Sequence, residues 1–576
     1  MTTTRHRLTI IAAAAAIVAY GSLLRLDAYV GKYGVLDRPA WARVMTHDVA
    51  AFARAVRPGT VIWQRIATPY AGGDPISYLK FGREMTSFYQ PHVREPVFLA
   101  AIRVSLWLLQ GQDAAVSLAS AVGSVLMIVA AFLLGRELAG IWAGLAAALV
   151  MAIEYDLIIW SVDGWRDDMF SAFALLSAWT LLRLYRRASF GNAVLAGLVC
   201  GLTCLTRVTA LSFIVPALLW IAAAGRARPS RQRLTYTALA AGLSLAVLAP
   251  FLISCAIATG DPFLAIDQQT VYYRAAEGAR TEQSVSAGRY LADKFAARPI
   301  ATMDVGLTGL FVRPFAIKWN GFRVWLSWLG TALFWCSLAG LATAVFLPEG
   351  RFLLLILFAS LLPYAFTWNI GGGGEWRFTM HAYGFYVVAA MYAIALAARR
   401  MDRRMVLAVA WRAAIVVVVA AAATAIYVVF PWFVVREGIA LGDSVSVEAG
   451  PRDVVFFRSG WSPATAQGNI MVRVSREPRA VVHFPLPSKS EYDVVLRFDP
   501  VAPGANPWAM ILFNQQLAGR IALSTTPGRV GSYRLTLPRD WQKAGDNELA
   551  IASSGAEGAR LWLVRILPMR PQAQSQ

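Results

Sequence analysis

Three groups of charged residues lie beside long apolar runs, and they are the places in this sequence where chemistry could occur. In chain order they are residues 72–85 (GGDPISYLKFGREM) with 94–96 (REP), residues 161–168 (SVDGWRDD), and residues 375–378 (EWRF). Carboxylates in such places can act as a general base toward a hydroxyl or coordinate a divalent cation. Arginines suit phosphate, because the planar guanidinium donates two hydrogen bonds at once. Together these groups suggest a phosphate-linked substrate that meets an acceptor.

The same charged residues could instead have only a structural role, because charged residues at a membrane edge often serve as interfacial anchors. Three acidic and basic groups on one side of the membrane favour a functional reading. Glu154 and Asp156, in or near the end of an apolar run, could cap a helix or face a polar cavity, and both stay unassigned.

These charged groups must be positioned by a membrane-spanning fold. Hydrophobic residues make up 57% of the 576 residues, and the mean hydropathy is +0.51. This is more apolar surface than one water-soluble core can bury. A transmembrane helix needs about 20 apolar residues, and the sequence contains about eleven apolar runs that could form one, of which the pair flanking Arg207 is short and ambiguous. They lie near residues 8–24, 114–134, 138–160, 169–185, 193–204, 208–224, 236–258, 324–347, 352–367, 381–397 and 413–433.

The distribution of arginine predicts the orientation of these runs. The net charge is +20, and the arginines cluster in alternate loops, at residues 136, 186–187, 226–233, 351 and 399–404. By the positive-inside rule these loops are cytoplasmic, and the charge pattern indicates membrane topology, with no nucleic acid as partner. We therefore predict a multi-pass protein of the inner (plasma) membrane that contacts membrane lipids, with a cytoplasmic N-terminus.

A β-sandwich is predicted after residue 436. Short segments of alternating hydrophobicity are separated there by turn-forming residues. There are about eight of them, the number that a two-sheet jelly roll needs. They are residues 453–457, 470–474, 480–484, 492–498, 508–513, 533–537, 547–551 and 561–566. The predicted domains are a transmembrane domain at 1–436, whose first periplasmic loop is 27–97, and a periplasmic sandwich at 437–576.

The predicted sandwich is similar to the carbohydrate-binding domains that are often attached to sugar-handling proteins. Its candidates for an exposed sugar platform are Trp461, Trp508, Trp541 and Trp562. Core packing is the simpler role for each of these side chains.

Five short segments resemble the GT-C class of membrane glycosyltransferases, nearest the branch of aminoarabinose and protein O-mannosyl transferases. They occur in the order and at the topological positions of that branch, and the resemblance covers residues 1 to about 225. The segments are Asp74–Met85, Arg94–Pro96, Gly135–Gly140, Ser161–Asp168 and Gly197–Arg207. The fold class implied is a polytopic α-helical membrane protein with a C-terminal all-β sandwich.

The resemblance also implies an activity. The protein would be an inverting glycosyltransferase that moves a hexosyl or pentosyl group from a polyprenyl-phosphate donor to a lipid, glycan or protein acceptor outside the cytoplasm. It implies that Asp74 is the catalytic base, and that Asp167 or Asp168 supports the site or a divalent cation, Mg or Mn. Arg377 and Arg94 would contact the lipid phosphate. The further candidates for substrate binding are Tyr78, Glu95, Arg166 and Glu375.

The sequence departs from the family pattern in two places. Pro75 follows Asp74 where the family usually has a second acidic residue, which weakens a two-carboxylate metal site there. Any metal ligands would come from Asp74, Asp167 and Asp168. The family's catalytic Asp also lies closer to the first span, and residues 35–71 look like an insertion, so Asp27 is a rival for the catalytic base.

Two other classes of protein stay open. A secondary transporter would also have many spans with charges inside, although the sequence has no convincing internal repeat. A catalytically inactive sugar-binding or assembly protein would keep the scaffold and use the sandwich, and its function would not depend on Asp74.

Overall fold

The structure is a computed structural model, in which the chain forms two compact units. The helical unit comprises Met1–Leu291 and Val305–Val416, and the sandwich unit comprises Ala292–Asp304 and Val417–Gln576. The predicted domain boundary at residue 436 stays a prediction. The structure describes residues 2–33, 73–224, 230–277, 284–315, 327–367, 376–398, 425–450, 452–467, 470–477, 479–500, 507–526, 530–553 and 558–569.

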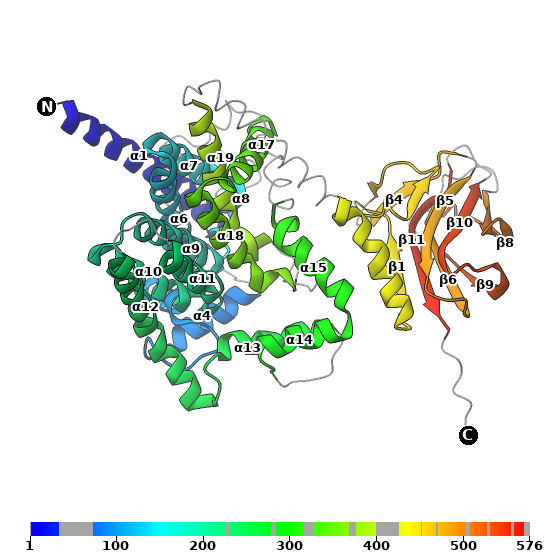
Figure 1. The fold of residues 1–576 in the computed structure, drawn as a ribbon, viewed down its shortest axis with the longest axis horizontal. Helices are drawn as coiled ribbons and strands as arrows, with labels where there is room; N and C mark the ends of the chain where they lie inside the picture. Colours follow the sequence, from blue (N-terminus) through cyan, green and yellow to red (C-terminus); the bar gives the residue numbers. More distant parts are fainter. Residues whose placement is uncertain are drawn as a thin grey trace. The chain divides into compact units, whose positions relative to one another are not determined.

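Helices make up nearly all of the described helical unit (Figure 1). In chain order the helices are α1 (Thr2–Tyr33), α4 (Asp74–Glu84), α5 (Pro96–Leu108), α6 (Ala115–Ala139), α7 (Ile141–Ile153), α8 (Tyr155–Trp160), α9 (Asp167–Arg186), α10 (Phe190–Thr206), α11 (Leu211–Ala224), α12 (Ser230–Thr259), α13 (Leu264–Ala276), α14 (Ala287–Ala297), α15 (Pro299–Phe311), α17 (Ser327–Ala344), α18 (Pro348–Ala365) and α19 (Met380–Ala398). Two 3-10 turns, η1 (Val208–Ala210) and η2 (Trp376–Thr379), precede α11 and α19.

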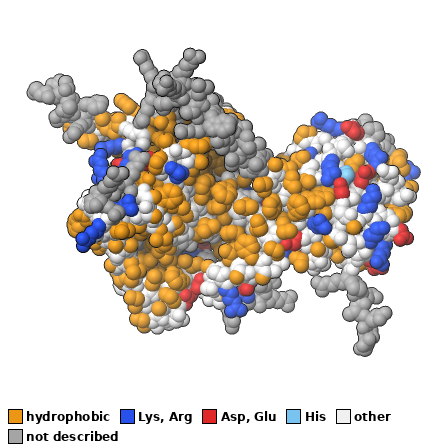
Figure 2. Space-filling view, in the orientation of Figure 1, with side chains coloured by type: hydrophobic (Ala, Val, Ile, Leu, Met, Phe, Trp, Pro, Cys, Tyr) orange, Lys and Arg blue, Asp and Glu red, His pale blue; other side chains and the backbone are white. Residues whose placement is uncertain are grey.

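The helical unit is built to lie in a membrane. Five described stretches are long and apolar enough to cross one: Leu8–Tyr29, Ala115–Ala139, Arg231–Thr259, Pro348–Ala365 and Met380–Ala397. Five shorter apolar helices accompany them. Hydrophobic side chains cover most of the visible surface of this unit (Figure 2), and Trp107, Trp142 and Ile257 are among the most exposed. The polytopic membrane fold is therefore confirmed, whereas the count of about eleven spans stays a prediction.

Most predicted runs correspond to helices, but the run at residues 138–160 is not one continuous helix. Gly140, at φ 100°, separates α6 from α7, and Glu154 has an extended backbone between α7 and α8. The Glu154 carboxylate is fully buried and accepts a hydrogen bond of 2.7 Å from the Tyr383 hydroxyl of α19. The run at 413–433 is described only from residue 425, where a helix at 425–440 belongs to the sandwich unit.

Glycines let the central helices pack closely. A Cβ on Gly135 of α6 would lie 3.1 Å from Gly144 of α7, so their backbones are in contact. A Cβ on Gly197 of α10 would lie 2.8 Å from the carbonyl oxygen of Ala240 in α12. Such small residues are typical of interfaces between membrane helices, where van der Waals packing replaces the hydrophobic effect.

The sandwich unit contains two antiparallel sheets (Figure 1). One has the strand order β3-β4-β11-β6-β9 with β1 also on β11, and the other has the order β2-β5-β10-β7-β8. The strands are β1 (Val445–Glu448), β2 (Phe457–Ser459), β3 (Thr465–Gln467), β4 (Ile470–Val474), β5 (Ala480–Leu486), β6 (Tyr492–Asp499), β7 (Trp508–Phe513), β8 (Gln516–Ala522), β9 (Gly531–Leu537), β10 (Gly545–Ser553) and β11 (Arg560–Pro568).

Seven of the eight predicted strands are confirmed, and the one at Asp453–Phe457 is wrong. The Asp453 carboxylate accepts from the Gly450 amide, and the Asp453 carbonyl accepts from the amides of Phe456 and Phe457. These bonds form a turn, and β2 begins only at Phe457. Of the candidate platform residues, Trp461 and Trp541 pack partly buried against the sandwich core.

Candidate active site

The first two charged groups of the sequence meet where α9 begins. Gly73 has φ 65°, and a Cβ there would lie 3.8 Å from the Trp165 ring. A Cβ on Gly164, at φ 84°, would lie 3.2 Å from Pro75. Asp74, the first residue of α4, is half-buried and is thereby held beside the loop that carries Trp165.

The end of α1 reaches the same loop. The Lys32 ammonium donates to Asp163 Oδ1 at 2.9 Å and to the Val162 carbonyl at 2.8 Å. Asp27, the rival for the catalytic base, lies in α1 and is half-buried.

Glu95 connects three separate parts of the helical unit. It lies at the N-cap of α5, and its side chain is buried. One carboxylate oxygen accepts from the Arg166 guanidinium, and the other accepts from the Val208 amide of η1 at 2.8 Å. Burial by itself lowers the pKa of Arg166, but the Glu95 charge opposes this, and the net pKa is raised. Arg166 is therefore a permanently charged side chain.

Arg207 makes a second buried ion pair beside the first. Its guanidinium donates to Asp167 Oδ1 and, at 2.9 Å, to the Tyr364 hydroxyl. The guanidinium carbon lies 5.3 Å from the ring centroid of Phe170 and 5.4 Å from that of Phe378, which allows cation–π attraction. The beginning of α9, the α10–η1 junction and α18 thus meet at one cation.

Asp168 has a different hydrogen-bond partner from its neighbour Asp167. It is fully buried, and its Oδ2 accepts from the Ser120 hydroxyl of α6 at 2.8 Å. A Cβ on Gly123 would lie 2.6 Å from the Met169 amide, so α6 and the start of α9 are in backbone contact. The two neighbouring carboxylates therefore turn to different partners, one to an arginine and one to a hydroxyl.

A cavity of about 400 Å³ opens beside these ion pairs. Glu95, Arg166 and Arg207 form its polar end, and Tyr364 and Tyr273 add hydroxyl groups. Burial raises the pKa of Tyr273, so this hydroxyl stays protonated. The remaining wall is mainly apolar and comes from α11, α13, α14 and α18, with Leu211, Ile266, Leu291, Leu362 and Phe366 among its residues.

The arginines of this region keep donors without an acceptor. The Nε atoms of Arg166 and Arg207, and that of nearby Arg94, are buried and have no hydrogen-bond partner among the described residues. A buried donor that lacks a partner costs about 1–3 kcal/mol. Such donors beside a cavity are the chemistry that an anionic ligand would satisfy.

The other predicted site residues do not line the cavity or cannot be placed in it. Tyr78 is buried in contact with Phe98, with ring centroids 5.5 Å apart, and the Arg94 guanidinium lies 5.8 Å from the Tyr78 ring. Neither Tyr78 nor Arg94 lines the cavity. Glu375 lies outside the described residues, and Arg377 is described only as a backbone position in η2.

The sequence reasoning did not assign Arg207, Tyr364 or Phe378 to the site. A signal for Arg207 is present, because it is the only charged residue between Phe190 and Ala224. A charge inside so apolar a stretch is usually functional or tightly paired. Tyr364 has no comparable signal, because aromatic residues are common in every apolar run. Phe378 lies in the third charged group, residues 375–378, although its charged neighbours drew the attention there.

The fold and the site together define a polytopic membrane protein that carries an arginine-lined cavity among its helices and a C-terminal β-sandwich. Residues 90–253 match the family model described as dolichyl-phosphate-mannose-protein mannosyltransferase. No curated protein matches the chain significantly.

The solved structures similar to the chain include membrane transferases and carbohydrate-binding domains. ArnT from Cupriavidus metallidurans bound to undecaprenyl phosphate is 14% identical, with a TM-score of 0.40 over 76% of this chain and 70% of that one. Archaeal oligosaccharyltransferase AglB from Archaeoglobus fulgidus, in complex with an inhibitory peptide and a dolichol-phosphate, is 17% identical, with a TM-score of 0.39 over 73% of this chain and 56% of that one. The GH26-CBM35 β-(1,4)-mannanase from Podospora anserina is 13% identical, with a TM-score of 0.18 over 23% of this chain and 29% of that one.

Proposed function

We propose that this protein is a membrane glycosyltransferase that moves a sugar from a polyprenyl-phosphate donor to an acceptor outside the cytoplasm. The observation that carries the proposal is the cavity of about 400 Å³, whose polar end holds Arg166 and Arg207 and whose wall is otherwise mainly apolar. A polyprenyl-phosphate sugar has this same division into an anionic head and an apolar tail. The family match over residues 90–253 supports the same class of reaction.

The two cavity arginines would hold the donor phosphate. Each is fixed by a buried carboxylate, Arg166 by Glu95 and Arg207 by Asp167, and each keeps a buried Nε without an acceptor among the described residues. Fixed donors need no reorganisation when charge develops on the leaving phosphate. In this proposal Glu95 and Asp167 are positioning residues, and the arginines contact the substrate.

Asp74 would act as the general base. It begins α4 and lies beside the loop that leads to Arg166, although it is not part of the cavity lining. The acceptor hydroxyl would give its proton to the Asp74 carboxylate while its oxygen bonds to the anomeric carbon. The bond from that carbon to the phosphate oxygen breaks, and its electron pair leaves with the lipid phosphate. Attack opposite the leaving group inverts the anomeric configuration.

A divalent cation fits the described carboxylates poorly. Asp167 is paired with Arg207, and Asp168 is bonded to Ser120. Among the residues that the structure describes, no three His, Cys, Asp or Glu side chains gather in a way that could hold a metal ion. No step of this proposal therefore passes through a metal.

We also propose on which side of the membrane the cavity lies. Arg136 lies in the last turn of α6, Arg186 ends α9 and Arg187 follows it. All three are away from Asp167 and Asp168, which begin α9. With the arginine-rich end in the cytoplasm, the cavity faces the outer leaflet of the inner membrane. The acceptor would then be a lipid, glycan or protein in the periplasm, and the sandwich unit would also be periplasmic.

The test is transfer of radiolabelled sugar from polyprenyl-phosphate donors, in membranes that contain equal amounts of each variant. We expect loss of transfer in Asp74→Asn, and a loss of tenfold or more in Arg207→Lys. Glu84→Gln is the matched control, because Glu84 lies in the same helix and is exposed. Asp27→Asn decides between the two candidate bases.

Three results would count against the proposal or part of it. If the wild type consumes no donor, the enzyme reading fails and the transport and sugar-binding alternatives replace it. If Asp74→Asn equals Glu84→Gln while Asp27→Asn is inactive, the base is Asp27. Full activity in Arg207→Lys would exclude this cavity as the phosphate site.

A further inference from the structure

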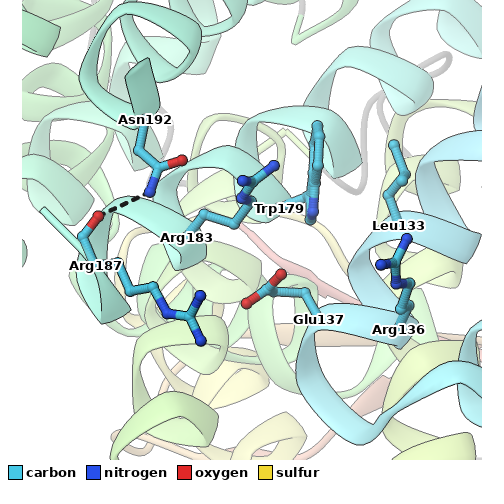
Figure 3. A pocket seen from close by; sticks show the side chains of 7 residues that line it. All are labelled: Leu133, Arg136, Glu137, Trp179, Arg183, Arg187 and Asn192. Atoms are coloured by element: carbon cyan, nitrogen blue, oxygen red, sulfur yellow. Dashed lines mark hydrogen bonds between the residues drawn. The ribbon is translucent and has the colours of Figure 1, made fainter. Parts of the chain in front are cut away.

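A second cavity lies at the other end of α9. The helix runs from Asp167 to Arg186, and its 20 residues span about 30 Å, the thickness of a hydrocarbon core. The cavity has a volume of about 280 Å³ and lies where α6 and α9 end and α10 begins (Figure 3). It is lined by Leu133, Arg136, Glu137, Trp179, Arg183, Arg187 and Asn192.

Three guanidinium groups gather around this cavity without ion-pair partners in the described part of the chain. They belong to Arg136, Arg183 and Arg187. Arg183 lies over the Trp179 ring, 5.2 Å from its centroid, and makes no ion pair there. Membrane topology explains why arginines lie at this end, but it does not explain why three of them line one hollow.

The acidic residue in the cavity does not cancel this charge. Glu137, which reaches into the space between Arg136 and Arg187 in Figure 3, is bonded to Arg186, with Nη1 3.2 Å from Oε1. Arg186 also lies 3.7 Å from Glu349. The four arginines and two glutamates of this group therefore leave a net charge of +2 beside the cavity.

The beginning of α10 adds a further positive potential. Ser189 caps this helix by accepting from the Asn192 amide, and the Asn192 side chain is fixed by a 2.8 Å bond to the Arg187 carbonyl. The N-terminal end of a helix carries a partial positive charge that favours anions. The guanidinium groups of the lining arginines offer hydrogen-bond donors to the same cavity.

We propose that this cavity binds one phosphate group, carried by an anionic lipid headgroup or by a soluble phosphate compound. The cavity volume, the net charge of +2 and the free guanidinium donors match a phosphate mono- or diester. The site is distinct from the proposed donor site, because it lies at the opposite end of α9, and it does not depend on the proposed glycosyl transfer.

The test is native mass spectrometry of the full-length protein released from detergent. One arm adds phosphatidylglycerol, a second adds phosphatidylcholine with the same acyl chains, and a third adds inorganic phosphate. The variant is Arg183→Gln with Arg187→Gln. The matched control is Arg231→Gln with Arg351→Gln, which removes the same charge from exposed arginines outside the cavity.

We expect one equivalent of phosphatidylglycerol to bind the wild type and the control in preference to phosphatidylcholine. Surface arginines contribute about fivefold each to the binding of anionic lipids, so the cavity variant should bind at least tenfold more weakly. Arg183→Lys with Arg187→Lys should recover part of the affinity, because it keeps charge and loses only the planar fork. The thermal midpoint of each variant shows whether it is folded.

The third arm identifies the source of the phosphate. Binding of inorganic phosphate that is lost in the cavity variant, without a preference for phosphatidylglycerol, supports a soluble ligand at the same arginines. The proposal is overturned if a folded cavity variant binds both phosphatidylglycerol and inorganic phosphate as the control does.

Discussion

Glu95 and Arg166 are 71 residues apart in the chain and form an ion pair that is almost fully shielded from solvent. Neither residue is part of a long helix: Glu95 caps α5, and Arg166 precedes α9. The same carboxylate holds the Val208 amide. One acidic side chain therefore fixes both the cavity arginine and the turn that follows Arg207.

We predict that Glu95→Gln loses stability and transfer together. Glutamine can still accept from the Val208 amide, but it leaves the buried Arg166 charge without a partner. Removing one member of a buried ion pair costs about 3–5 kcal/mol. Thermal unfolding and sugar transfer measure the two effects, with Glu84→Gln as the exposed control. A variant that keeps both the wild-type midpoint and the wild-type rate contradicts this role of Glu95.

Tyr364→Phe should have a smaller effect on transfer than Arg207→Lys. The tyrosine change removes one hydrogen bond to the guanidinium, which contributes about 1 kcal/mol or fivefold. A lysine at 207 has a single ammonium in place of a fork that contacts Asp167 and Tyr364 together. The rate of sugar transfer at saturating donor is measured for both variants. A larger loss in Tyr364→Phe than in Arg207→Lys would mean that the Tyr364 hydroxyl itself contacts the substrate.

Gly201→Ala should destabilise the helical unit. A Cβ there would lie 2.6 Å from Val247 Cβ in α12, closer than real Cβ contacts allow. Overpacking of this kind costs about 1–3 kcal/mol. Gly242→Ala in α12 is the control, because nothing lies within 4 Å of its Cβ position. Equal thermal midpoints for the two variants would show that α10 and α12 are not this closely packed.

Asp453→Asn should destabilise the sandwich unit. Asp453 is buried, bonds Arg473 Nε at 2.6 Å and accepts from the Gly450 amide. The change leaves the buried arginine unpaired, at a cost of about 3–5 kcal/mol. Asp546→Asn weakens the contacts of the exposed Asp546 carboxylate with Arg458 and His483 instead and should cost about 0–1 kcal/mol. Amide hydrogen exchange in the strands compares the stability of the two variants. Similar protection in Asp453→Asn and Asp546→Asn would count against the prediction.

Much of the architecture could be predicted from the sequence because the signals are local. The apolar run at 114–134 became α6, and the alternation at 508–513 became β7 with the same bounds. The edge strand β8 was missed because its exposed, glycine-containing sequence has no alternating pattern. The break at Glu154 was missed because hydropathy averages over a window and hides a single buried carboxylate.

The site was predictable only in part, because its geometry depends on contacts between distant segments. Glu95 and Arg166 were candidates from their neighbours in sequence, and both line the cavity. The partnership of Arg207 with Asp167 could not be read from spacing, since it depends on how α9 and α10 pack. Whether Asp74 is the base stays a prediction.

The ion pairs at the two ends of α9 give this helix a fixed length and rotation within the bundle. Asp167 is held by Arg207 at one end, and Arg186 is held by Glu137 at the other. Inserting one residue into α9 would turn its far end by about 100° and advance it by about 1.5 Å, so both pairs could not form. The helix therefore serves as a spacer with a defined register, and the chain can tolerate a substitution at a half-buried position such as Leu176 more readily than any change in the length of α9.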